Sequence, residues 1–271
     1  MENCPRWIRR IRPASTVRKP YRNYPPSKNV DIAKVVDPNS LEQDGLAGHN
    51  GTSGQTEGRL AGETTLPYLT FRQRDFEVFS VEGFSARMEL IYRHIRPRLV
   101  KLGDDLAPEL SRRLHMEFFP HVAKHARRTV NPPAETWAAF GPSPKGYKRY
   151  GYLALCISRA GLHARAVVKT EADHRDEIGA KLRAKASDLA KSFRGTKIAH
   201  YEKWDLAHLP ATTTADPPFF ELIADAFTKK TSVLDVGFGW RVHDALRLER
   251  AELLDAFAEL EPLYRVLRSV S

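Results

Sequence analysis

The stretch HVAKHARRTVNPPAETWAAFGPSPKGYK, residues 121–148, is the part of the chain from which the fold prediction starts. At 100° per residue, the small apolar side chains of residues 121–130 fall on one arc and most of the cations fall on the other. This pattern predicts a short amphipathic helix. The helix must end near Asn131, because Pro132 disfavours the α region for the residue before it and Pro133 continues a stiff, extended segment.

The second half of the stretch predicts a strand followed by a turn. Thr136 to Phe140 is aromatic and small-apolar, which is typical of the beginning of a strand. Gly141 to Pro144 has the composition of a turn or loop. The segment from Lys145 to Lys148 would then bring two more cations and an aromatic ring back towards the first cations.

The crowding of like charges predicts an anion site. Cations on one face repel each other, a bound anion relieves that repulsion, and arginine matches the geometry of phosphate or carboxylate. We expect a base to stack on Trp137 or Tyr147 and a neighbouring histidine, His125, to donate a hydrogen bond to phosphate. The cations expected to contact the phosphate are Lys124, Arg127, Arg128, Lys145 and Lys148.

Three functional interpretations remain open on the sequence. The first is a protein that binds a phosphate-bearing ligand, either a nucleotide or RNA. The second is an enzyme acting on a phosphorylated or carboxylated metabolite, in which His125 is the candidate catalytic acid or base and Asn131 orients the anion. The third is a structural role, in which the basic residues form a solvated face or pair with carboxylates of the core.

Two motifs suggest chemistry that the residues around them do not support. His121 and His125 have the spacing of a helical metal pair, but no Glu follows His121 and the nearby cations would oppose a divalent ion, so no metal site is predicted. The segment Val233 to Gly239 resembles the glycine-rich loop of S-adenosylmethionine-dependent methyltransferases. Arg241 occupies the place of the third glycine and too few residues follow for the rest of that sheet. We therefore predict a late antiparallel strand and no cofactor.

The run from Val122 to Pro133, together with Thr136-Trp137 and Gly146-Tyr147-Lys148, closely resembles the signature of the YktB-like (UPF0637-type) family of bacterial proteins. The resemblance extends from about Leu66 to the C-terminus and includes an Asp75-Phe76-x-x-Phe79 segment. It implies a compact α+β domain in a bacterial cytoplasm. It implies no activity, so it assigns no catalytic residue.

Composition and charge limit the partners and the compartment. The net charge of +10 favours acidic partners such as nucleotides, nucleic acid or phosphorylated metabolites. Only two cysteines are present, Cys4 and Cys156, which excludes a disulfide framework and a four-ligand zinc site and fits a reducing compartment. No apolar run is long enough to span a membrane, and the beginning of the chain lacks the apolar region of a secretory signal. We expect a cytoplasmic protein that does not bind a membrane.

The remaining sequence predicts a disordered leader over residues 1–65 and a single domain over residues 66–271. The leader is basic and proline-rich, then rich in Gly and Ser; it would be an accessory tail or would hold nucleic acid. In the domain, hairpin and helices follow one another without regular βαβ alternation, so the fold class is α+β with a mixed or antiparallel sheet packed by helices. The predicted helices cover residues 74–79, 88–102 with a break near Arg96, 106–114, 173–194, 219–227 and 250 onward; the predicted strands cover 152–158, 162–169, 198–204 and 233–242.

Overall fold

The computed structural model describes residues 71–126, 128–202 and 204–268. The predicted leader, the predicted start of the domain at Leu66, and Arg127 lie outside these residues. In chain order the helices and strands are α2 (Gln73–Glu77), η2 (Val78–Ser80), α3 (Phe84–Leu90), the π-helix η3 (Ile91–Ile95), α4 (Arg96–Leu114), β1 (Phe119–Val122), β2 (Glu135–Gly141), β3 (Tyr152–Ser158), β4 (Gly161–Val168), α5 (Arg175–Ala184), α6 (Ala186–Ser192), β5 (Lys197–His200), β6 (Thr212–Thr214), α7 (Pro217–Ala224), η4 (Asp225–Thr228), β7 (Leu234–Arg241), α8 (Val242–Ala245), α9 (Arg250–Glu259) and α10 (Glu261–Arg268).

The strands form one sheet in the order β1-β2-β3-β4-β7-β5-β6, and every neighbouring pair is antiparallel. The α+β prediction is therefore confirmed. β7 pairs with β4 along its whole length, as predicted for a late antiparallel strand. Its glycines do not follow the first strand of a parallel, cofactor-binding sheet.

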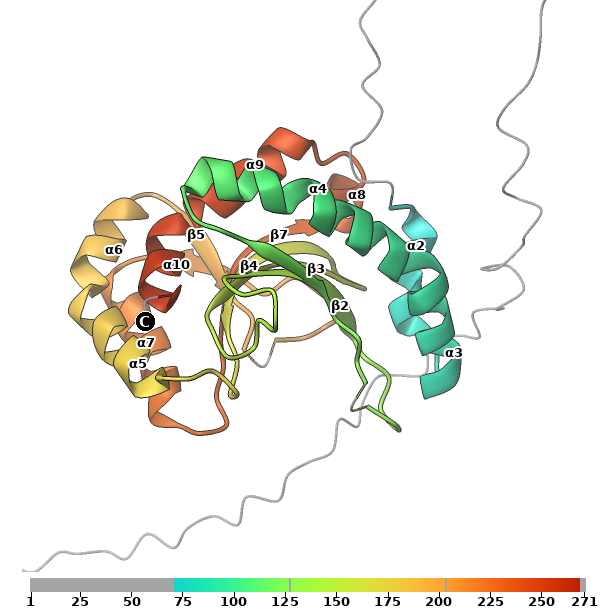
Figure 1. The fold of residues 1–271 in the computed structure, drawn as a ribbon, viewed down its shortest axis with the longest axis horizontal. Helices are drawn as coiled ribbons and strands as arrows, with labels where there is room; N and C mark the ends of the chain where they lie inside the picture. The colour runs from blue at the N-terminus through green and yellow to red at the C-terminus, as the bar shows by residue number, and fades with distance from the viewer. Residues whose placement is uncertain (1–70, 127, 203, 269–271) are drawn as a thin grey trace, which may run out of the picture. The chain divides into compact units, whose positions relative to one another are not determined.

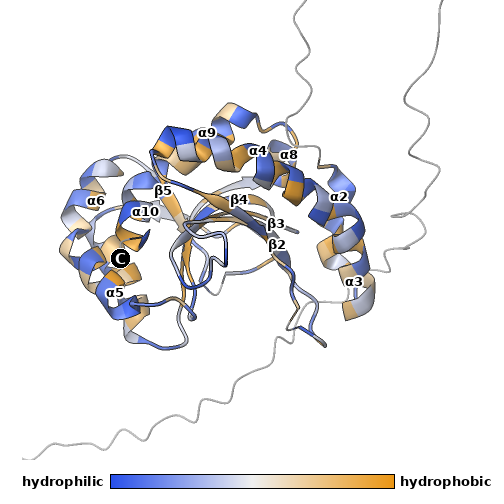
Figure 2. Cartoon of the chain, viewed as in Figure 1, coloured by the Kyte–Doolittle hydropathy of each residue, from blue (hydrophilic) through white to orange (hydrophobic). Residues whose placement is uncertain are grey.

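Helices cover one face of the sheet. Figure 1 shows the sheet arching beneath α4 and α9, with α5, α6, α7 and α10 beside one end of it. The covered face is apolar: Phe140 of β2 packs against Phe257 of α9, and Gly103 of α4 lies over Pro120 and Ala138. Figure 2 shows the strands as largely hydrophobic and the helices as hydrophobic on one side only. Burial of this apolar face is the main stabilising contribution of the layer.

The opposite face of the same strands carries charged side chains beside a small apolar cluster that includes Ala139, Tyr152 and Val167. Because side chains alternate along a strand, the register places Trp137 beside Cys156 and Cys156 beside His163 on this face. Arg165, two residues further along β4, lies on it as well. The candidate site residues described below lie on or beside this face.

The predicted helix over residues 121–130 is wrong. Residues Phe119–Val122 form the edge strand β1, and the backbone N–H of Ala123 still bonds to the carbonyl oxygen of Trp137. His125 then adopts a left-handed conformation at φ 50°, which ends any regular structure. Pairing with β2 outweighs the helical periodicity, since a ten-residue amphipathic pattern carries little helical stability of its own.

The hairpin formed by β3 and β4 is confirmed, with a turn at Arg159-Ala160. The helix that begins at Pro217 is also confirmed, and its N-cap is Asp216, whose side chain accepts from the backbone N–H of Phe219. The predicted break near Arg96 lies where the π-helix η3 ends and α4 begins. The segment 106–114 is a continuation of α4, not a separate helix.

Other predicted boundaries need correction. The helix predicted from residue 173, with Asp173 as its expected N-cap, begins at Arg175: the N-cap of α5 is His174, and Asp173 instead accepts from the guanidinium of Arg149. The predicted helix after it is divided into α5 and α6. The strand predicted over 198–204 ends at His200, and the last predicted helix is divided into α9 and α10. Among the helices that the structure describes, none has the length and apolar character needed to cross a membrane.

Candidate functional site

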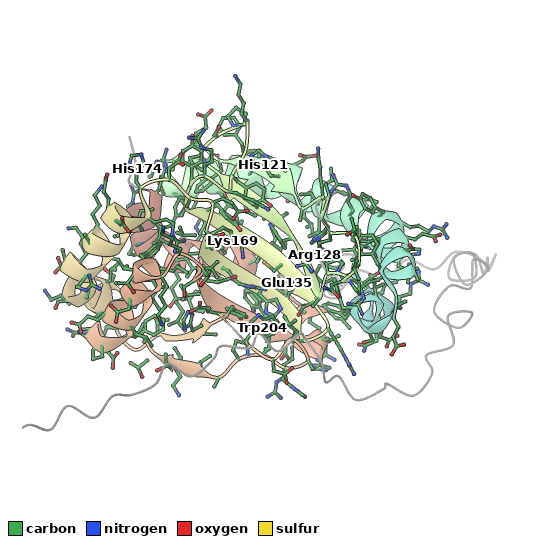
Figure 3. All side chains as sticks on the ribbon, turned by 90° about the horizontal axis from the view of Figure 1, so that it is seen from below. His121, Arg128, Glu135, Lys169, His174 and Trp204 are labelled. Carbon is green, nitrogen blue, oxygen red and sulfur yellow. The ribbon has the colours of Figure 1, made fainter. Side chains whose placement is uncertain are left out.

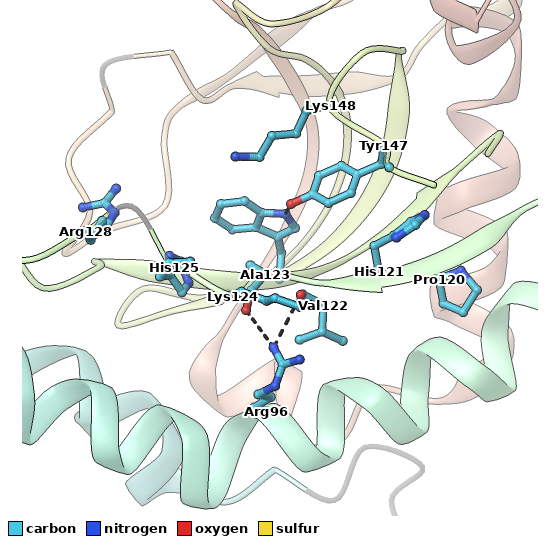
Figure 4. A pocket seen from close by; sticks show the side chains of 13 residues that line it. Arg96, Pro120, His121, Val122, Ala123, Lys124, His125, Arg128, Tyr147 and Lys148 are labelled. Atoms are coloured by element: carbon cyan, nitrogen blue, oxygen red, sulfur yellow. Dashed lines mark hydrogen bonds between the residues drawn. The ribbon is translucent and has the colours of Figure 1, made fainter. Parts of the chain in front are cut away.

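A cavity of about 720 Å³ opens where β1, the loop that follows it, β2 and the loop after β2 meet the beginning of α4. Figure 4 shows this cavity from close by. The residues that line it are Arg96, Pro120, His121, Val122, Ala123, Lys124, His125, Ala126, Arg128, Trp137, Gly146, Tyr147 and Lys148. Its volume lies within the range of small-molecule sites, which is about 300 to 1,000 Å³.

Four cations, Arg96, Lys124, Arg128 and Lys148, line the cavity; we call them the cationic wall. Among the described residues that line the cavity, none is an aspartate or a glutamate. Arg96 donates to the backbone carbonyl oxygens of Val122 and Ala123, at 3.4 and 2.9 Å, so it fixes the edge strand to α4 (Figure 4).

The other three members of the cationic wall are engaged to different degrees. Lys148 lies 3.8 Å from a carboxylate oxygen of Glu171. Lys124 and Arg128 are exposed and form no ion pair with any residue that the structure describes. In Figure 4 the side chain of Lys148 extends towards the side of the cavity where Arg128 and His125 lie. These cations are thus available to an anion that enters the cavity.

Aromatic rings form another side of the cavity. The indole N–H of Trp137 donates to the hydroxyl of Tyr147 at 3.0 Å, and the Tyr147 ring also packs against Tyr152 and His121, with ring centroids 4.7 and 5.3 Å apart. Burial raises the pKa of Tyr147 to about 12, so this phenol keeps its proton at neutral pH. The ammonium of Lys169 lies 5.7 Å from the centroid of the Trp137 ring. Trp137 is thus held in one orientation from several sides.

His125 is half-buried between this aromatic side and the cationic wall. Its Nε2 shares a hydrogen bond of 3.0 Å with the hydroxyl of Thr136, and its ring meets the edge of Trp137 at 5.4 Å. Burial and, next, the positive charge of Arg128 lower the pKa of His125 to about 4. The imidazole is therefore neutral at pH 7: it can donate one hydrogen bond and accept another, but it lacks the imidazolium proton that a general acid transfers.

The structure brings most of the predicted site residues together. Those that line the cavity are Lys124, His125, Arg128, Trp137, Tyr147 and Lys148. Asn131 and Lys145 are exposed and do not line it. Arg127 lies outside the described residues. Within the described ranges, no group of three or more His, Cys, Asp or Glu side chains has an arrangement that could hold a metal ion.

Sequence reasoning missed a cluster of charges buried beside the cavity, on the polar face of the sheet. Arg165, whose side chain is 1 % exposed, donates to Oδ2 of Asp235 at 3.2 Å and to Oε2 of Glu135. Lys169 lies 3.6 Å from the same Asp235 oxygen. We call these four residues the buried charge cluster. Figure 3, which views the molecule from below, shows Glu135 between Arg128 and Trp204.

Aromatic rings cover the buried charge cluster. The Arg165 guanidinium lies 4.3 Å from the ring centroid of Tyr201 and 5.6 Å from that of Trp204. Both rings also pack against His163, which shares a hydrogen bond of 2.9 Å with the hydroxyl of Ser158. Burial lowers the pKa of His163 well below its usual range, so its ring is neutral. This Ser–His pair is fully buried and is no accessible nucleophile.

The glycines of β7 permit this packing. A Cβ on Gly237 would lie 2.0 Å from the carbonyl oxygen of Ala164, and a Cβ on Gly239 would lie 2.6 Å from the hydroxyl of Tyr201. Both positions therefore need glycine for close approach and not for cofactor binding. In the sequence, the signal for the cluster is the pair His163 and Arg165 in an otherwise apolar strand.

Glu135 remains ionised within the cluster. Burial alone would raise the pKa of its carboxyl, but the charge and hydrogen bond of Arg165, followed by the charge of Lys169, outweigh burial and lower it. Its side chain is 20 % exposed, whereas that of Asp235 is 6 % exposed. Of the two carboxylates, Glu135 is the one that solvent can reach more easily.

Comparison with known proteins identifies relatives of this chain. The model of a domain of unknown function (DUF1054) matches residues 71–264. A UPF0637 protein of Bacillus velezensis is 34% identical over 218 residues, which cover 76% of this chain and 100% of the relative. A UPF0637 protein of Bacillus licheniformis is 31% identical over 75% of this chain and 98% of its own length. One from Staphylococcus aureus is 51% identical over 79 residues, 29% of this chain and 39% of the relative.

Proposed function

This chain belongs to the UPF0637 (DUF1054) family, and we propose that it binds a small phosphate-bearing ligand in the cavity beside β1 and β2. The observation that carries the proposal is the pairing of the cationic wall, without any lining carboxylate, with the ring of Trp137. Cations bind phosphate by charge and hydrogen bonds, and an aromatic ring held in one orientation stacks a planar group. The reducing compartment favoured by the free, buried Cys156 and the bacterial relatives supports action in the cytoplasm.

The dimensions of the cavity favour a small ligand over RNA. A nucleic-acid site needs a broad basic surface that follows the phosphate backbone. Here the cationic wall surrounds about 720 Å³, which suits a single nucleotide or a phosphorylated metabolite.

The catalytic alternative rests on the position of His125 in the cavity. Its low pKa opposes acid catalysis in the free protein. A bound anion close to the ring would favour the charged imidazole and raise that pKa, so turnover would require the ligand itself to activate His125. The form of the structural alternative in which the arginines pair with core carboxylates predicts a buried Arg128, whereas Arg128 is exposed and forms no ion pair with the described residues. The form in which the basic residues are a solvated face predicts that no ligand binds.

Thermal unfolding of the full chain with a panel of nucleotides, phosphorylated metabolites, RNA and DNA tests the proposal. A ligand at 100 times its Kd should stabilise the protein by about 2.7 kcal/mol. Arg128→Ala and Lys124→Ala should each weaken that shift. Lys145→Ala removes an exposed cation from the same region without touching the cavity, so it is the matched control and should leave the shift unchanged.

Three outcomes are informative. A shift with a small phosphate compound, reduced in Arg128→Ala and retained in Lys145→Ala, supports the proposal. A shift only with polynucleotide, lost at high salt, would replace it with nucleic-acid binding. If no compound shifts the midpoint, or if Lys145→Ala is as damaging as Arg128→Ala, the cavity is not the binding site.

A further inference from the structure

One partly exposed carboxylate, that of Glu135, lies beside the cavity in the same strand as Trp137, although it is not among the residues that line the cavity. Glu135 and Trp137 are two residues apart in β2, so their side chains point to the same face of the sheet. Glu135 also interacts electrostatically with both His125 and Lys169, which flank the Trp137 ring. A ligand lying on Trp137 with its phosphate at the cationic wall would therefore have Glu135 beside the ring on which it lies.

The buried charge cluster holds Glu135 in place. Arg165 donates to one carboxylate oxygen, Oε2. The described residues offer no hydrogen bond to the second oxygen, Oε1. Because Arg165 is itself fixed by Asp235 and by the Tyr201 ring, the position of the Glu135 carboxylate is set before any ligand binds. A fixed, ionised and partly exposed carboxylate accepts hydrogen bonds from hydroxyl and amino groups.

Stability alone does not account for such a cluster. Replacing a buried ion pair by apolar residues of similar volume is often neutral or stabilising, because both charges lose their hydration. Two further atoms of the cluster, Nε of Arg165 and Oδ1 of Asp235, are buried without a hydrogen-bond partner among the described residues. The cluster therefore has a desolvation cost that an apolar core at the same place would avoid. What the cluster provides in return is a fixed orientation of the Glu135 carboxylate.

We infer that Glu135 is a specificity-determining residue and that the ligand is a nucleoside phosphate, whose sugar hydroxyl or base amino group donates to Glu135. The inference rests on the proposed function and names its ligand class. The cationic wall takes the phosphate, Trp137 takes the planar base, and Glu135 distinguishes this ligand from phosphate compounds that lack a donor. Arg165 is a positioning residue, since it reaches the ligand only through Glu135.

The test compares probes with and without a donor. Calorimetry on the full chain measures the binding of the four ribonucleoside 5′-monophosphates and of phenyl phosphate, which has a ring and a phosphate but no hydroxyl or amino donor on the ring. Glu135→Gln keeps the shape of the side chain and removes its charge. Loss of a hydrogen bond to a charged group should weaken the tightest nucleotide by about tenfold or more. Binding of phenyl phosphate should change by less than about twofold, a change expected for a group it does not touch.

Asp235→Asn is the matched control. It removes the other carboxylate partner of Arg165 and so perturbs the buried charge cluster similarly, but Asp235 is too buried to meet a ligand in the cavity. The amide oxygen of this variant can still accept from Arg165, and the guanidinium is still bonded to Glu135 and covered by Tyr201, so Glu135 keeps its position. If the ligand donates to Glu135, nucleotide affinity should therefore stay within about threefold of the wild-type value. If Glu135→Gln does not fold, Glu135→Gln/Arg165→Met removes both charges of the pair and should show the same selective loss.

The outcomes separate the inference from the function on which it rests. Selective loss of nucleotide binding in Glu135→Gln supports the inference. Equal loss for nucleotide and phenyl phosphate, equal loss in Asp235→Asn, or no loss at all would overturn it, while leaving phosphate binding in the cavity intact. Absence of binding of every probe to the wild-type protein would overturn the proposed function and the inference together.

Discussion

Replacing Arg165 by methionine is expected to destabilise the fold strongly, because it leaves two carboxylates without their shared cation. Methionine keeps much of the apolar volume of the arginine stem, so little of the effect would come from a new cavity. The guanidinium lies 3.2 Å from Asp235, is bonded to Glu135, and is covered by Tyr201 at 4.3 Å. All three contacts disappear at once.

The expected magnitude follows from these contacts. At 3.2 Å and an effective dielectric constant of 20, Coulomb attraction is about 5 kcal/mol, an upper limit that desolvation reduces. Measured losses on removing one partner of a buried pair are about 3 to 5 kcal/mol. Lys169, 3.6 Å from Asp235, still compensates that carboxylate, so we expect a loss of about 4 kcal/mol from a total stability of about 5 to 15 kcal/mol.

Urea denaturation of the full chain at several pH values measures this loss. In the wild-type protein the pKa of Glu135 lies below its ordinary value of 4.5, so its stabilising contribution is present above pH 4.5 and is lost as the pH falls through the folded-state pKa. Without the guanidinium, burial raises the pKa of Glu135 instead. Protonation of Glu135 in the variant then removes the cost of an unpaired buried charge. The difference between wild type and Arg165→Met should therefore shrink as the pH falls from 7 to 5.

A compensating variant provides the decisive comparison. Arg165→Met/Glu135→Gln/Asp235→Asn removes all three charges and should regain most of the lost stability, because neutral amides bury at lower cost than unpaired carboxylates. The reasoning is refuted if Arg165→Met lies within about 1 kcal/mol of the wild type, the range of an exposed ion pair. It is also refuted if the triple variant is no more stable than Arg165→Met.

Three further predictions can be measured on the same protein. Gly239→Ala places a Cβ 2.6 Å from the Tyr201 hydroxyl, and this overpacking should lower the free energy of unfolding by about 1 to 3 kcal/mol. A melting temperature equal to that of the wild type would show that Tyr201 moves freely. The folded-state pKa of His125 is about 4, against an ordinary 6.5, so stability should fall by about 2 kcal/mol as the pH drops from 6.5 to 4, allowing for partial exposure. His125→Gln should reduce the slope by this amount, while buried His163, whose pKa is also lowered, still contributes; an unchanged slope would assign it to other groups. Tyr147→Phe removes the hydroxyl that accepts the 3.0 Å hydrogen bond from the Trp137 indole, and it should lower the free energy of unfolding in urea by about 1 kcal/mol. Tryptophan emission should shift to the red or broaden. Unchanged emission would contradict the orientation of the Trp137 ring.

The sequence predicts the centre of the sheet well because that region depends on local patterns. The apolar runs over 152–158 and 162–169 indicate a hairpin from local sequence alone, and its turn lies at Arg159-Ala160. The step Pro217-Pro218 likewise marks the beginning of α7, which starts two residues before the predicted 219. These features need only neighbouring residues, and the structure has them where the pattern indicates.

The edge of the sheet is different, because β1 is specified by its partner. Residues 121–130 have a helical periodicity, yet His121 and Val122 pair with β2 across the loop that contains Pro132 and Pro133. That pairing turns His121 to the face of the cavity and leaves the following cations on an irregular loop. The candidate residues could be predicted from the sequence. Their arrangement along one side of the cavity could not, because it depends on the pairing of β1 with β2.

The buried charge cluster could not be predicted from spacing, since its members are distant in the sequence. Arg165 is separated by 30 residues from Glu135 and by 70 from Asp235. Only the order β2-β3-β4-β7 brings them to one face, and a register shift of one residue would turn each of them to the apolar face. A charge in a strand such as β4 signals a buried partner without identifying it.

The two faces of the sheet indicate why the site lies where it does. The face beneath α4 and α9 is apolar and needs no ligand to be stable. The other face holds ionised groups that water would solvate better, and it retains them beside Trp137, the residue that contacts both the cavity and Lys169. Trp137 lines the cavity together with the cationic wall and contacts Lys169 of the buried charge cluster, so under the proposed function the wall and the cluster would be two ends of a single site. Replacing Trp137 by leucine should therefore weaken nucleotide binding more than Lys124→Ala or Arg128→Ala does. Equal losses of affinity in calorimetry for these three variants would indicate that the wall and the cluster do not form one site.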